Sequence, residues 1–97
     1  MNNAPDLQAK LKRLETALLM SKKTNLRVIE YEAKLRGIDS DTLYGYVVQY
    51  RANPNTVSDS VANIAEFIIH YLRNEPRSRW PAESAILFDR FLDKDAK

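Results

Sequence analysis

The chain has 97 residues, of which 44% are hydrophobic and 29% charged, and its net charge is +2. This is the composition of one folded domain, residues 1–97, and the small net charge argues against a general polyanion binder. The absence of cysteine excludes disulfides and thiolate metal sites, and only two glycines and four prolines argue against a loop-rich or all-β fold. We therefore expect a small helical domain.

The first predicted helix begins near Pro5, because proline suits the first helical turn, and it fades around residues 21–23. One of its faces carries leucines spaced four, three and four residues apart, which is the pattern of a bundle seam. These are Leu7, Leu11, Leu14 and Leu18.

A second predicted helix begins after Thr24 or Asn25, either of which can cap it. Gly37 ends this helix, because glycine readily adopts the left-handed conformation of a C-cap, and Ile38 follows as the usual apolar contact. The break between the first two predicted helices is weak, so one long helix is the alternative.

A third helix, about residues 40–52, is predicted from a cluster of N-capping residues around Asp39 and Asp41. Gly45 lies inside it, where glycine costs about 1 kcal/mol relative to alanine, so we expect another helix to approach closely at this position. The sequence of residues 53–56 breaks the helix and caps the next one.

The fourth predicted helix, roughly residues 57–73, is apolar around most of its circumference. Such a helix needs neighbours on several sides, so it is predicted to be the centre of a bundle, although a homodimer could also cover so wide an apolar face. Its narrow polar stripe consists of Asp59, Asn63, Glu66, His70 and Arg73.

Pro76 cannot continue the fourth helix, and a basic turn containing Arg77 and Arg79 follows. Pro81 then opens a short fifth helix with a broad apolar side. Trp80, between the turn and this helix, has two interpretations: an anchor for a partner, or a staple that folds the last helix against the fourth one. The staple is the favoured interpretation.

No catalytic motif is present. His70 is the only histidine and lies four residues after Glu66, but a metal site needs a further ligand and acid–base catalysis needs a pocket, so the two are interpreted as a polar-stripe pair. The chain has no glycine-rich phosphate loop and no serine in a nucleophile setting. We therefore expect no enzyme activity, no metal and no cofactor.

A membrane span and a signal peptide are not expected either. The best apolar stretch, residues 57–72, is shorter than the roughly 20 residues that a membrane helix needs, and it carries charged side chains. The N-terminal residues lack a basic segment followed by an apolar one.

The charge is uneven along the chain. Residues 1–38 hold eight Lys or Arg against four Asp or Glu, a net charge of +4, whereas residues 39–97 carry −2. The basic half could favour an acidic partner or anionic lipid, although a solvated helix surface explains it as well. Nucleic acid is disfavoured, because a recognition helix that presents Asp39 and Asp41 would be repelled by phosphates.

From about residue 43 to 92, the sequence follows a loose pattern of residue types. An apolar helix over residues 61–72 is followed by basic residues, an aromatic, a helix-starting proline and an acid. The corresponding residues are Arg77, Arg79, Trp80, Pro81 and Glu83, followed by Ile86-Leu87 and Phe91-Leu92. This pattern resembles that of the immunity proteins that protect producers of pediocin-like (class IIa) bacteriocins.

The resemblance implies a cytoplasmic antiparallel four-helix bundle without enzyme activity. It also implies action at the inner membrane face, where such proteins lock the bacteriocin onto its receptor. That receptor would be a mannose-type phosphotransferase permease. Peripheral association with the membrane is compatible with this role. Because specificity in that family is carried mainly by the C-terminal half, the resemblance suggests a set of partner-binding residues in this chain. These are Arg77, Arg79, Trp80, Phe88, Phe91 and Lys94.

We therefore predict an all-α fold, an antiparallel four-helix bundle with a short fifth C-terminal helix, and a role in bacteriocin immunity. The alternative is a small helical regulator or adaptor of phage or plasmid type. Such a protein would bind a protein or nucleic acid through the basic N-terminal half, which includes Lys12, Arg13, Lys22 and Lys23.

Overall fold

The computed structural model describes residues 4–21, 23–82 and 84–88, and within these residues it contains helices and no strand. The prediction of an all-α fold with four main helices is confirmed. The main helices are α1 (Ala4–Met20), α2 (Leu26–Leu35), α3 (Ser40–Ala52) and α4 (Asp59–Asn74), and the short 3-10 turns are η1 (Pro54–Thr56) and η2 (Arg77–Arg79). Residues 84–88 are α-helical too and belong to the predicted fifth helix.

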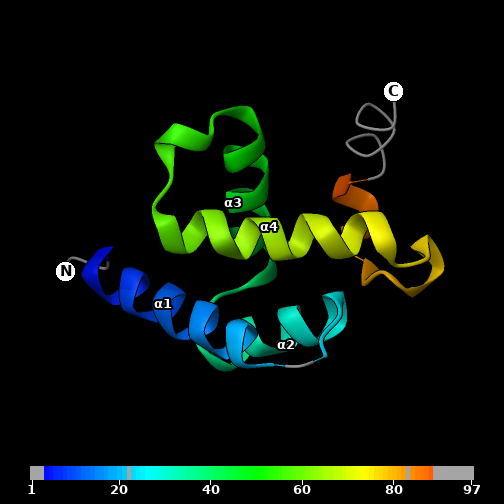
Figure 1. The fold of residues 1–97 in the computed structure, drawn as a ribbon, viewed down its shortest axis with the longest axis horizontal. Coiled ribbons are helices and arrows are strands. Elements are labelled where there is room, and N and C mark those ends of the chain that lie inside the picture. Colours follow the sequence, from blue (N-terminus) through cyan, green and yellow to red (C-terminus); the bar gives the residue numbers. More distant parts are fainter. Residues whose placement is uncertain (1–3, 22, 83, 89–97) are drawn as a thin grey trace.

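Helix α4 crosses the middle of the molecule, with α1 and α2 on one side and α3 on the other (Figure 1). In this view α2 runs back beside α1, so these two helices are antiparallel, whereas α4 runs in the same general direction as α1. Because α4 contacts α1, α2 and α3, it is the shared centre of the bundle, as its apolar circumference predicted.

The core side of α4 consists of buried aliphatic side chains. Ser58 caps the helix: its hydroxyl accepts a hydrogen bond from the Val61 N–H. Burial of each large aliphatic side chain contributes about 1.5–3 kcal/mol to folding, so α4 supplies much of the stability. The buried residues are Val61, Ile64, Ala65, Ile68, Ile69 and Leu72.

The first two helices are separate, as the main prediction had it. Asn25 caps α2 by accepting a hydrogen bond from the Val28 N–H at 2.9 Å. At the other end Gly37 has a φ of +80°, and the Ile38 N–H donates to the Ala33 carbonyl at 2.9 Å. Ile38 is buried, so the predicted glycine C-cap with its apolar contact is confirmed.

The prediction for Gly45 is wrong. Gly45 is exposed, and a Cβ atom built on it would meet no atom within 4 Å, so no helix approaches it closely. Helix α3 faces the core instead with Leu43, Tyr44 and Val47. None of the helices described by the structure combines the length and apolar character needed to cross a membrane.

The two glycines give a matched test of the fold. We expect Gly45→Ala to raise the free energy of unfolding by about 1 kcal/mol, because alanine is the better helix former and its methyl group meets nothing here. Gly37→Ala should lower it, because alanine resists a positive φ and its Cβ would lie 3.1 Å from Lys10 Nζ. Urea denaturation of both variants measures the effects, and destabilisation by Gly45→Ala would contradict the position given to α3.

Candidate functional site

The chain reverses direction after α4. Trp80 attaches the segment that runs back along the bundle, residues 77–88, which we call the C-terminal return. Its side chain is only 5% exposed, and its indole Nε1 donates a hydrogen bond to the Glu75 carbonyl at 3.2 Å. The guanidinium of Arg77 lies over the indole ring, 5.3 Å from its centroid. The structure therefore agrees with the staple interpretation of Trp80 rather than with an exposed anchor.

Phe88 is the second attachment point of this return. Its ring is fully buried and meets Tyr44 of α3 edge-on, with the ring centroids 5.4 Å apart. The Tyr44 hydroxyl in turn donates to the Glu30 carboxylate of α2 at 2.6 Å. Residues 84–88 are thereby packed on the bundle, since aromatic pairs add to the free energy of burial.

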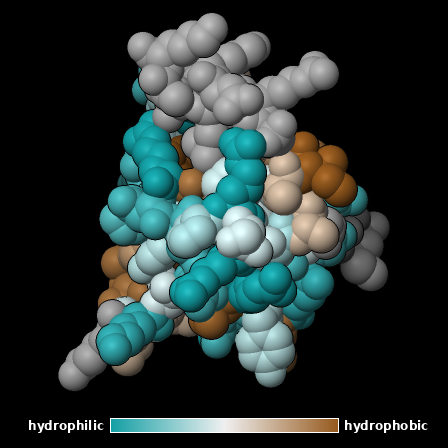
Figure 2. Space-filling model, turned by 90° about the vertical axis from the view of Figure 1, so that its right-hand side faces the viewer, coloured by the Kyte–Doolittle hydropathy of each residue, from teal (hydrophilic) through white to brown (hydrophobic). Residues whose placement is uncertain are grey.

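The returning segment leaves two cations and two apolar side chains in solvent. We call Arg77, Arg79, Ile86 and Leu87 the C-terminal surface. Both arginines are exposed, Ile86 is 79% exposed and Leu87 is 48% exposed. Figure 2 shows the end of the molecule where η2 lies: it is mostly hydrophilic, with separate hydrophobic areas between the polar side chains.

The residues predicted to bind a partner therefore divide into three groups. Arg77 and Arg79 are on the surface, whereas Trp80 and Phe88 belong to the core and cannot touch a partner while the segment is packed. Phe91 and Lys94 lie outside the described residues.

Ile86 and Leu87 are not among the predicted contact residues, because the sequence places both on the apolar side of the fifth helix. Leu87 and Ile86 precede Phe88 by one and two residues, which turns them about 100° and 200° away from it around a helix. Because Phe88 is the buried residue, this helical spacing places the Ile86 and Leu87 side chains on the side that faces away from the core.

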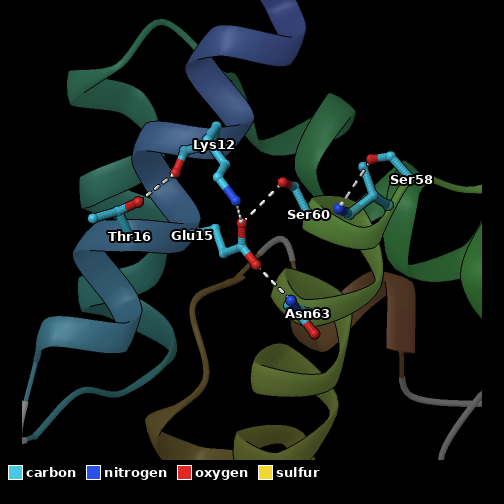
Figure 3. A network of polar contacts seen from close by, with 7 residues as sticks. Lys12, Glu15, Thr16, Ser58, Ser60 and Asn63 are labelled. Carbon is cyan, nitrogen blue, oxygen red and sulfur yellow. Dashed lines mark hydrogen bonds and ion pairs between the residues drawn. The ribbon is translucent and has the colours of Figure 1, made fainter.

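The polar stripe of α4 connects the central helix to α1. Glu15 of α1 is buried, and its carboxylate accepts hydrogen bonds from Asn63 and Ser60 of α4 (Figure 3). Lys12 Nζ completes the cluster at 3.2 Å from the same carboxylate. The hydrogen bonds from Asn63 and then Ser60 hold the pKa of Glu15 below its ordinary value.

This cluster is a structural clamp between α1 and α4. Hydrogen bonds to a buried carboxylate are among the stronger ones in proteins, so the cluster fixes α1 against α4.

Glu66 and His70 both lie on the exposed polar stripe of α4, as interpreted from the sequence, and each contacts a different partner. Glu66 accepts a hydrogen bond from the Tyr50 hydroxyl of α3, which raises the pKa of Tyr50. His70 Nδ1 lies 3.3 Å from the Asn74 amide nitrogen, and its ring meets Tyr71 edge-on. The polar stripe thus joins α4 to α3 as well as to α1.

Within the part of the chain that the structure describes, no three His, Cys, Asp or Glu side chains gather closely enough to hold a metal ion. Comparison with known proteins gives no match to a family model, to a curated protein or to a solved structure. On geometric grounds the C-terminal surface is the candidate binding site, because two buried aromatic rings hold its exposed charged and apolar side chains in place.

The clamp predicts a specific pH dependence. Because the pKa of Glu15 is lowered in the folded protein, its contribution to stability is complete above the ordinary value of 4.5 and is lost as the pH falls through the lowered pKa. We expect Glu15→Gln to reduce the free energy of unfolding at neutral pH and to make its decline between about pH 5 and pH 3 shallower. Urea denaturation over this range measures both effects.

Glu32→Gln is the matched control. Glu32 makes a partly exposed ion pair with Arg36, four residues further along the chain, and this pair does not connect two helices. Its effect at neutral pH should be the smaller one. An unchanged acid profile for Glu15→Gln would show that Glu15 does not clamp α1 to α4.

Proposed function

We propose that this chain is an immunity protein of the pediocin-like bacteriocin type. In this role it protects the producing cell by acting on the complex between the bacteriocin and its receptor permease at the inner membrane face. The observation that carries the proposal is the return of the chain after α4, pinned by Trp80 and Phe88, with the C-terminal surface left exposed. This is the part of the chain in which the resemblance puts specificity.

The geometry suits recognition of a protein partner. A short segment held by two buried rings has little conformational freedom left to lose on binding, and such preorganisation favours affinity. The Arg77 guanidinium rests against the Trp80 ring, which holds its charge in one place. Exposed Ile86 and Leu87 add apolar area that a partner can bury.

The test is protection of living cells. We expect expression of this chain in a bacteriocin-sensitive lactic-acid bacterium to protect it against one or a few members of a panel of pediocin-like peptides. Arg79→Glu and Leu87→Ser should each reduce protection by about tenfold in inhibitory peptide concentration, because each removes a contact of the C-terminal surface. Growth inhibition assays measure the effect, and circular dichroism confirms that the variants fold.

The chain offers matched controls for both substitutions. Arg27→Glu reverses an exposed charge on α2, and Val48→Ser removes an apolar side chain of α3 that is 47% exposed, close to the 48% of Leu87. Both control variants should protect like the unchanged protein. The proposal fails if a well-expressed, folded chain protects against no peptide, or if the control substitutions reduce protection as much as those in the C-terminal surface.

A further inference from the structure

Helix α1 carries a shallow, open hollow of about 570 Å³ on the side that faces away from the core. The core side of this helix is occupied by leucines such as Leu11 and Leu14, whereas its outer side has short side chains at Ala9, Thr16 and Ala17. These short side chains form the floor of the hollow. It follows α1 over residues 9–20, which is about 16 Å at the helical rise per residue.

The edge of the hollow is cationic. Lys12 and Arg13 of α1 and Arg36, which follows α2, line it, and the Lys12 side chain is 71% exposed. Arg13 is exposed as well.

Two of the three edge cations, Lys12 and Arg36, have a carboxylate partner in this half of the chain. Glu15 accepts a hydrogen bond from Ser60 of α4 and also lies 3.2 Å from Lys12 Nζ, so it offsets the charge of Lys12. Glu30 accepts the hydrogen bond from Tyr44 of α3. Glu32 pairs with Arg36 at 2.6 Å and offsets one charge of the edge. With Glu15 and Glu32 counted against Lys12, Arg13 and Arg36, the edge keeps a net charge of +1 (3 − 2) beside an apolar floor.

We propose that this hollow binds an acidic amphipathic helix of another protein. The short floor residues let a second helix approach α1 at ordinary packing distance, about 8–10 Å between axes. Apolar side chains of that helix fill the hollow, and its carboxylates face Lys12, Arg13 and Arg36. A helix can place its apolar side chains between the spaced short residues of the floor, which is why a helix is the occupant proposed.

This surface shares no residue with the C-terminal surface, and the two belong to different parts of the chain. Figure 1 places α1 along the lower edge of the molecule and residues 77–88 at its right-hand end. The inference therefore goes beyond the proposed immunity function and stands or fails separately from it.

The probe is a synthetic, fluorescently labelled peptide of about 18 residues, long enough to span the hollow as a helix. It carries leucines along one helical face and glutamates elsewhere. We expect saturable binding to the full chain, with amide chemical-shift changes confined to residues 9–20 and Arg36. Arg13→Glu, which reverses an edge charge, and Thr16→Trp, which fills the hollow, should each weaken binding by about tenfold.

Two controls separate this site from general charge attraction. Arg27→Glu reverses an exposed charge outside the hollow and should change the dissociation constant by less than about twofold. A peptide of the same composition with its leucines scattered around the helix should not bind.

Three results would overturn the proposal. One is equal binding of the scattered peptide, and another is an effect of Arg27→Glu as large as that of Arg13→Glu. The third is binding to phosphatidylglycerol vesicles without binding to the amphipathic peptide, which would make this face a membrane-binding surface instead.

Discussion

The rest of the structure depends on one constraint: the apolar surface of α4 must be buried by neighbouring helices on several sides. Its aliphatic residues, such as Ile64 and Ile68, leave almost no surface to water, so three other helices must be arranged around it. The few polar positions of α4 then determine how those helices are attached. Asn63 and Ser60 hold Glu15 of α1, and Glu66 holds Tyr50 of α3. A helix that is mainly hydrophobic thus gains specific contacts from its narrow polar stripe.

The same requirement extends to the segment that follows α4. Trp80 and Phe88 continue the core beyond the end of the helix and reach back to Glu75 and Tyr44. The two rings are separated by only eight positions, so the turn and the short helix that bear Arg79 and Leu87 cannot move far from the bundle. The C-terminal surface is presented by the fold itself, so its charged and apolar side chains are exposed without a further folding step.

The features that could be predicted from the sequence are those that depend on residues close together in the chain. The Asn25 and Asp39 caps and the Gly37 C-cap depend on atoms within three or four residues, and the helix boundaries near them were predicted well. Gly45 was interpreted wrongly because a glycine inside a helix has the same local pattern whether or not another helix lies over it. The partner of Glu66 and the burial of Phe88 depend on α3, which is distant in sequence. No local pattern contains that information.

Fluorescence of Trp80, the only tryptophan in the chain, is the most direct test of the claim that the C-terminal return is part of the fold. With an exposed fraction of 5% and its indole N–H bonded to the Glu75 carbonyl, Trp80 should emit at short wavelength and be quenched weakly by acrylamide. Both properties should change together when urea unfolds the bundle. Emission and quenching like those of free tryptophan, in a chain whose circular dichroism is fully helical, would contradict the packed return and the binding surface built on it.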